Sequence, residues 1–184
     1  MARPIVIVSH DPAWAAHFEE LRLPLWQAVH DIALRIEHVG STSVPGLPAK
    51  AVIDLVVVVP SAAEVPLASA RICALGYEDV GDLGIPDRTA FRYANHRLPH
   101  HLYVCPASSP ALANHLAFRD RLRARPDLAA AYADLKRALA QRFPNDGGAY
   151  SRAKTGFVVG VLREVGFSEA ALAAIEAANR DPLE

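Results

Sequence analysis

The stretch HVGSTSVPGLPAKAVID contains a Gly-Ser turn, then twelve residues, then an aspartate that begins an apolar run. Gly40 has no Cβ, so the backbone there can approach a ligand closely. The hydroxyls of Ser41 and Thr42, with N–H groups left free at a turn, favour an anion. Lys50 adds a cation, and Asp54 can hold a metal ion against the same phosphates. These residues predict a phosphate site. The alternative is a common turn followed by a strand aspartate that caps a neighbouring loop.

The elements that must position this loop follow from hydrophobic periodicity. Apolar residues spaced by four and three predict a helix over residues 11–29, with a kink or break at Pro24. A capping box, SAAE at residues 61–64, opens a second helix that ends near residue 75. The continuous β-branched run at residues 52–59 is typical of a central strand covered on both faces. Further strands are expected at 34–39, 77–80, 89–94 and 101–105, and a short strand or arm at 5–8.

The character of the sequence changes after Pro106, where helical patterns replace strands. Helices are expected at about 109–124, 127–143, 147–165 and 168–179. The result is an α+β fold: a small mixed sheet flanked by helices in residues 1–106, with C-terminal helices in 107–184 packed on it. At 184 residues, the chain is expected to form a single domain over 1–184.

Composition narrows the classes of function. The chain is 52% hydrophobic, which supports a real core, and its net charge of −1 gives no signal for nucleic acid or an anionic membrane. Residues 115–154 carry nine Lys/Arg and four Asp/Glu, a net of +5, which fits ordinary helix surface or an anion-facing patch. No apolar run reaches the length of a membrane span. Two cysteines without a C-x-x-C motif, and no signal segment, predict a cytoplasmic protein with reduced thiols.

Six motifs resemble the GrpB family, a branch of the nucleotidyltransferase superfamily. They are HDPAWAAHF, EHVGSTSVPGLPAKAVIDL, GYEDVGDLGIPDRTAFR, HHLYV, HLAFRDRLRARPDLAAAYADLK and YSRAKTGFV, and together they span roughly residues 10–165. The resemblance implies a nucleotidyltransferase-like mixed sheet, with the Gly-Ser turn beside a central strand. A related domain is fused to dephospho-CoA kinase in some bacteria.

The resemblance also implies a chemistry that this sequence only partly retains. Active members of the superfamily carry two carboxylates on this strand, separated by one residue, and these hold two metal ions. Asp54 matches the first position, but Val56 stands at the second, and a valine cannot bind a metal. The resemblance therefore implies phosphate binding by Gly40, Ser41 and Asp54, with Mg²⁺ held by Asp54. The usual two-ion mechanism lacks its second ligand.

A later strand offers the nearest substitute for the missing carboxylate. The superfamily commonly draws a third acidic ligand from such a strand, and the matching region here is HHLY, where His101 and Tyr103 share a face. The imidazole of His101 can ligate a borderline metal or act as a general base near pH 7. The alternative is a strand histidine that is satisfied by ordinary hydrogen bonds.

Cations on the later helices complete the candidate site. Arg119, Lys136 and Lys154 lie within the motifs shared with the family, and two of them follow a tyrosine by four residues, Tyr132 and Tyr150. Aromatic and cationic pairs at this spacing suit a nucleobase and a triphosphate. They equally suit plain amphipathic helices, in which tyrosine packs and lysine is solvated.

The leading hypothesis is a nucleotidyltransferase-like protein that binds a nucleotide or another phosphorylated small molecule, with Mg²⁺-dependent nucleotidyl transfer as its reaction if it is an enzyme. The second is a non-catalytic binding or regulatory module, which Val56 favours. The third, a scaffold for coenzyme A synthesis, rests on the fused relatives alone. None of the three requires a membrane or a nucleic acid partner.

Overall fold

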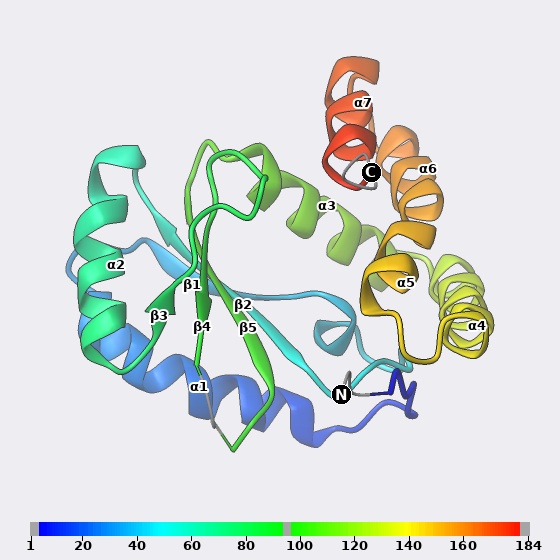
Figure 1. Cartoon of the computed structure of the whole chain (residues 1–184), viewed down its shortest axis with the longest axis horizontal. Helices are drawn as coiled ribbons and strands as arrows, with labels where there is room; N and C mark the ends of the chain where they lie inside the picture. Colours follow the sequence, from blue (N-terminus) through cyan, green and yellow to red (C-terminus); the bar gives the residue numbers. More distant parts are fainter. Residues whose placement is uncertain (1–3, 94–96, 181–184) are drawn as a thin grey trace.

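The computed structural model describes residues 4–93 and 97–180. Its centre is a mixed five-stranded sheet in the order β1-β2-β5-β4-β3, in which only β2 and β5 run parallel (Figure 1). The α+β class predicted from the sequence is confirmed. The strands are β1 (Arg35–Val39), β2 (Ile53–Val59), β3 (Glu78–Asp79), β4 (Thr89–Arg92) and β5 (His100–Pro106).

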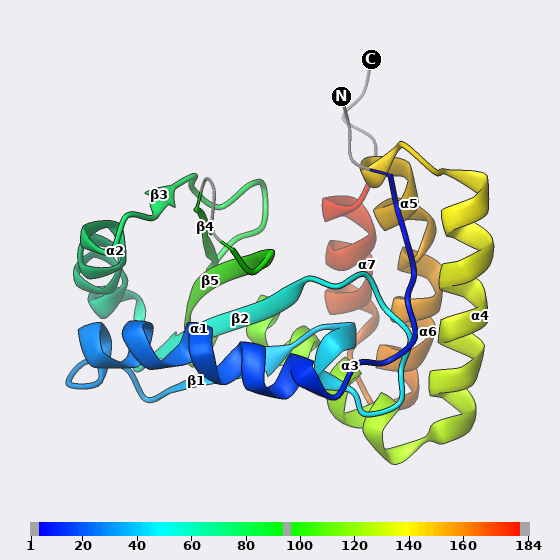
Figure 2. The same ribbon diagram turned by 90° about the horizontal axis from the view of Figure 1, so that it is seen from below.

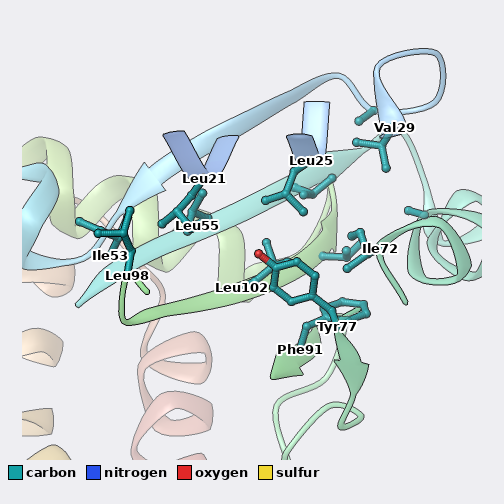
Figure 3. Close-up of a cluster of buried hydrophobic side chains, with 14 of the residues drawn as sticks. Leu21, Leu25, Val29, Ile53, Leu55, Ile72, Tyr77, Phe91, Leu98 and Leu102 are labelled. Carbon is teal, nitrogen blue, oxygen red and sulfur yellow. The ribbon is translucent and has the colours of Figure 1, made fainter. Parts of the chain in front are cut away.

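One face of the sheet is covered by α1 (Ala13–Val29) and α2 (Val65–Ala74). Their apolar side chains meet those of the two central strands in the main hydrophobic core, shown in Figure 3. The break expected at Pro24 does not occur, since α1 is continuous through it. Pro24 is exposed, whereas its neighbours Leu21 and Leu25 are buried, so packing holds the helix on both sides of the proline.

The opposite face is covered by α3 (Pro110–Ala124), which packs Leu112 against Val56, Val58 and Cys105. The remaining helices form a layer beyond α3, at the end of the molecule away from α2 (Figure 2). These are α4 (Pro126–Arg142), α5 (Gly147–Ala153), α6 (Thr155–Glu164) and α7 (Glu169–Ala178).

The single helix expected over 147–165 is two helices, which join at Lys154. The Lys154 N–H donates to the Ser151 carbonyl at 3.3 Å, an i to i−3 bond that tightens the last turn of α5. The other predicted helices are found within one to three residues of their expected ends, and the capping box of Ser61 and Glu64 is present, opening a 3₁₀ turn (Ala62–Glu64) that leads into α2.

Residues 5–8 form an arm rather than a strand of the sheet. Val8 and Ala49 exchange backbone hydrogen bonds of 2.9 and 3.0 Å, and the Ile5 N–H donates to the Pro144 carbonyl at 2.8 Å. The arm thus ties the loop before β2 to the turn between α4 and α5. Throughout the described residues, every helix is too short or too polar to cross a bilayer.

Candidate functional site

A cavity of about 440 Å³ lies between the sheet and the helical layer, with walls from β2, β5 and α3 to α7. It brings together eight of the nine residues that the sequence proposed for binding or catalysis. These are Gly40, Ser41, Thr42, Lys50, Asp54, His101, Lys136 and Lys154. Arg119 does not line it. Segments more than a hundred residues apart in the chain therefore converge on the Gly-Ser loop.

Gly40 sits directly against the carboxylate of Asp54. Its φ of 70° and ψ of −173° belong to a backbone region that is essentially restricted to glycine. A Cβ at this position would lie 2.1 Å from Asp54 Oδ2, far inside van der Waals contact. The turn is fixed by Ser43, whose hydroxyl donates to the Gly40 carbonyl at 2.6 Å. Glycine is therefore required here both for conformation and for space.

The hydroxyl of Thr42 is used within the fold. It donates to the Val52 carbonyl at 3.2 Å, so the His38 Nε2 at 3.0 Å must be the donor to Thr42 Oγ1. His38 also stacks on Phe18, with ring centroids 4.6 Å apart. Burial lowers the pKa of His38 to about 4, which keeps the imidazole neutral. Thr42 borders the cavity, but its hydroxyl holds the loop to the start of β2.

Asp54 and His101 face each other across the two parallel strands. They are paired in register, and His101 Nδ1 lies 2.9 Å from Asp54 Oδ1. A carboxylate accepts at this contact, so the neutral imidazole carries its proton on Nδ1 and leaves Nε2 unprotonated. Such a nitrogen can take a proton or bind a metal ion. About half of the His101 side chain is exposed, so the ring is accessible from the cavity.

The second carboxylate position of the superfamily is filled by hydrocarbon. Val56 is completely buried and packs with Val39, Val58 and Leu112 under α3. Within residues 4–93 and 97–180, no group of three or more His, Cys, Asp and Glu side chains is placed to hold a metal ion. A pair of ions does not fit this donor set. A single Mg²⁺ does, because Mg²⁺ is commonly held by one carboxylate together with ligand phosphates and waters.

Three lysines surround the Gly-Ser loop. Lys136 is only 2% exposed, and its ammonium donates to Ser41 Oγ at 3.0 Å and to the Pro48 carbonyl. Lys154 and Lys50 lie over the ring of Tyr150, at 4.5 and 5.5 Å from its centroid. None of the three lysines has a carboxylate partner among the described residues.

Burial lowers the pKa of two of these ammonium groups, so they lose a proton more readily than an exposed lysine does. It lowers the pKa of Lys136 to about 7, and the charge of Lys154 adds to the effect. It lowers the pKa of Lys154 to about 8, with Lys50 adding to the effect and Asp54 opposing it. Three lysines thus share the cavity wall with the carboxylate of Asp54, and an anion that enters would be stabilised by all three.

Arg119 braces the sheet against α3 outside the cavity. Its Nη1 donates to Glu37 Oε2 at 2.7 Å and to the His38 carbonyl at 3.0 Å, and its Nε donates to Asp120 Oδ1 at 2.7 Å. His115, four residues earlier on α3, lines the cavity, whereas Arg119 meets β1. Arg119 therefore holds β1, the strand that leads into Gly40, and does not line the cavity itself.

We expect Arg119→Met to lower the free energy of unfolding by roughly 2 kcal/mol, because it leaves a half-buried Glu37 with weaker partners. Arg121→Met is the matched control on the same helix, since Arg121 pairs with a half-exposed Glu164 and should cost less than about 1 kcal/mol. Urea denaturation measures both. A variant of Arg119 that kept its stability but lost anion affinity would instead place this arginine at the ligand.

Sequence reasoning missed part of the cavity wall. Arg88 and Ile85 reach it from the loop between β3 and β4, and Asn114 reaches it from α3. The signal for this loop in the sequence was the GDLGIPDR segment, which lies within one of the motifs. Asp82 shapes a turn there, since its Oδ1 accepts the Gly84 N–H at 2.8 Å.

A family model described as GrpB protein matches residues 4–164. The chain belongs to the GrpB family. Protein YqkA of Bacillus subtilis is 34% identical over 152 residues, and a Pseudomonas aeruginosa relative is 37% identical over 162 residues. The alignments cover 83% and 86% of this chain but 44% and 66% of those proteins, so the chain spans only part of their length.

Solved structures extend this GrpB assignment to the fold. The crystal structure of GrpB from Enterococcus faecalis superposes with a TM-score of 0.78 at 34% identity, covering 91% of this chain and 98% of that one. Terminal uridylyl transferase 4 from Trypanosoma brucei, with bound CTP, gives a TM-score of 0.50 at 14% identity. It covers 92% of this chain and 57% of that chain, and shows a nucleotidyltransferase-like fold alone.

A dephospho-CoA kinase from Mycolicibacterium paratuberculosis also contains a GrpB-like region. It is 30% identical over 176 residues, which cover 82% of this chain and 43% of the kinase. The relation to dephospho-CoA kinases implied by the sequence motifs is therefore confirmed as a relation between sequences.

Proposed function

We propose that this GrpB-family chain binds a nucleotide, or another phosphorylated small molecule, in the cavity beside Asp54. The observation that carries the proposal is that Lys50, Lys136 and Lys154 line the same cavity as Ser41, and that none of them pairs with a carboxylate among the described residues. Buried ammonium groups without a counter-ion are unfavourable until an anion enters. A polyphosphate supplies several charges to one such cluster.

The Gly-Ser turn gives the phosphates a place to lie. Gly40 and Ser41 line the cavity beside Asp54, and Ser41 Oγ accepts a hydrogen bond from the ammonium of Lys136 there. A Mg²⁺ ion held by Asp54, when bound, would neutralise phosphate charge at the same place.

Nucleotidyl transfer is the reaction that this arrangement would support if an acceptor hydroxyl binds beside His101. The acceptor oxygen would form a bond to the α-phosphorus while the bond to the pyrophosphate oxygen breaks, and His101 Nε2 would take the hydroxyl proton. A regulatory module that binds without transfer is the second candidate. The burial of Val56 in the α3 interface favours it, since the superfamily's second metal ligand is absent. A role linked to coenzyme A synthesis rests on the dephospho-CoA kinase relatives.

A thermal-shift panel of nucleoside triphosphates and dephospho-CoA, with and without Mg²⁺, tests the proposal. A ligand at a hundred times its dissociation constant should stabilise the wild type by about 2.7 kcal/mol. Asp54→Asn should remove the Mg²⁺-dependent part of that shift, because an amide is a poor Mg²⁺ ligand. Asp82→Asn is the control, since Asp82 acts only in its turn. No shift with any compound would rule out the proposed function, and pyrophosphate release with an added acceptor would separate enzyme from module.

A further inference from the structure

Arg88 is a fourth cation in the cavity wall. The proposed binding of phosphates by the three lysines does not involve it. Arg88 follows the loop between β3 and β4, and its guanidinium lies over the ring of Tyr103, 4.6 Å from the centroid. Its Nη2 donates to the Asp82 carbonyl at 3.2 Å. Across residues 4–93 and 97–180 no carboxylate pairs with it, and its Nε is buried without an acceptor.

Most arginines elsewhere in residues 4–93 and 97–180 have a carboxylate partner, including Arg121, whose Nε is buried without an acceptor like that of Arg88. Ten of them pair with Asp or Glu side chains, at Arg22, Arg35, Arg71, Arg97, Arg119, Arg121, Arg123, Arg125, Arg137 and Arg163. A guanidinium that is partly desolvated and faces a cavity needs an anion for the same reason as the lysines do. Its planar fork matches a carboxylate or a phosphate, to which it can donate two parallel hydrogen bonds.

Within the one cavity, Arg88 and its neighbours line a compartment of their own. Arg88 lies over Tyr103 of β5, and Tyr103 stacks with His115 of α3. Burial lowers the pKa of His115. The strand register places this compartment away from the Gly-Ser loop, because Val39, the last residue of β1, pairs with Asp54, whereas Tyr103 pairs with Val56, two positions further along β2. Asp54 therefore lies between the Gly-Ser loop and Tyr103 along the strand direction.

The side chains around Arg88 can also bind polar groups. His115 stacks beside Tyr103, with 6.1 Å between ring centroids and 19° between planes. A neutral imidazole there offers one donor and one acceptor. His101, the partner of Asp54, lies next to Tyr103 on the same strand face, with ring centroids 6.5 Å apart. A molecule held at Arg88 would therefore lie beside Asp54 and His101.

We propose that Arg88, Tyr103 and His115 form a second anion subsite, which binds the carboxylate or phosphate group of a small second ligand on the far side of Asp54 from the lysines. The inference builds on the proposed function, in which the lysines hold the phosphates of the first ligand. It assigns a chemical class to the second ligand: a small molecule with an anionic group, in the position that an acceptor would take.

An NMR titration of ¹⁵N-labelled protein with inorganic phosphate tests this subsite. Two groups of amides should shift with separate apparent dissociation constants, one at residues 40–42 and one at residues 85–90. Arg88→Gln should weaken the second at least about tenfold and change the first less than about twofold, because it removes a charged fork from one compartment only. Lys154→Gln is the matched variant for the other compartment and should do the reverse. Arg88→Lys, which keeps the charge but not the fork, should weaken the second group less than Arg88→Gln does.

The outcomes separate the two proposals. Shifts at 40–42 alone, or an equal weakening of both groups by Arg88→Gln, would overturn the second subsite and leave the first intact. Shifts at 85–90 alone would support the subsite while the proposed function fails. Repeating the titration with acetate distinguishes a carboxylate from a phosphate as the preferred group.

Discussion

Replacing Gly40 by alanine is expected to lower the free energy of unfolding by roughly 2–6 kcal/mol and to abolish anion binding in the cavity. Two costs combine. Alanine is strained at this combination of φ and ψ, which costs about 1–3 kcal/mol. The added methyl would also collide with the Asp54 carboxylate, 2.1 Å away, and overpacking of this kind costs about 1–3 kcal/mol. Relief of the collision requires either the turn or Asp54 to move, and both belong to the site.

Gly46→Ala is the matched control in the same loop. Gly46 also has a positive φ, of 78°, but a Cβ there would meet nothing within 4 Å. The Gly46→Ala variant should lose only the free energy of backbone strain, about 1–2 kcal/mol. In the double variant Gly40→Ala/Asp54→Ala, the colliding oxygen is gone, so part of the stability should return. Chemical denaturation measures all of them, and equal losses for Gly40→Ala and Gly46→Ala would show that the contact with Asp54 has no energetic weight.

The affinity of the cavity for sulfate should fall by roughly tenfold or more between pH 6 and pH 9. Lys136 loses its proton near pH 7 and Lys154 near pH 8, so the free cavity becomes less positive through this range. A bound anion favours the protonated lysines, and each proton taken up on binding reduces affinity about tenfold per pH unit above the pKa. Sulfate is the suitable probe because its own charge stays constant. Thermal shift at several sulfate concentrations gives the affinity at each pH.

The stability of the ligand-free protein should move in the opposite direction. The pKa of Lys136 is lowered on folding, so between about pH 7 and the ordinary lysine value near 10.5 the unfolded chain binds more protons than the folded one. The contribution of this lysine to stability therefore rises with pH across that window. Lys136→Met should flatten both profiles, whereas Arg142→Met, an exposed change at the end of the same helix, should leave them nearly as they are. Sulfate affinity that stays constant from pH 6 to pH 9 would contradict the assignment of labile protons to these lysines.

The Gly-Ser loop and Asp54 could be predicted because turn and strand are close in sequence, and the apolar run from Ile53 to Val59 can only be a buried strand in a sheet this small. Lys136 and Lys154 were predicted from their spacing to tyrosines, and both reach the cavity. Arg119 was proposed because it lies in a motif shared with the family, and it pairs with Glu37 and Asp120 outside the cavity. Its place in a motif does not identify what its helix face meets, so its role at a ligand stays a prediction.

The position of Arg88 in the cavity wall could not be predicted from local sequence patterns. Its loop crosses the cavity only because β4 pairs with β5, with Ala90 opposite Tyr103, and because Leu83 and Asp87 adopt positive φ values that their residue types do not favour. No periodicity marks such a loop. The split between α5 and α6 at Lys154 was missed for a related reason, since a single tightened turn leaves the amphipathic pattern unchanged on both sides.

The hydrogen bonds of Lys136 have a consequence for the order in which the site is built during synthesis. The lysine contacts Ser41 and Pro48 across 95 and 88 positions of the chain, so the loop receives these bonds only after α4 has been made. Contacts this distant in sequence form late, because the entropy cost of closing a long loop comes before the contacts stabilise the fold. Nascent chains that end before α4 would carry the Gly-Ser sequence and the strand of Asp54 but not the shaped cavity. The ribosome can therefore complete the entire sheet before the cavity exists.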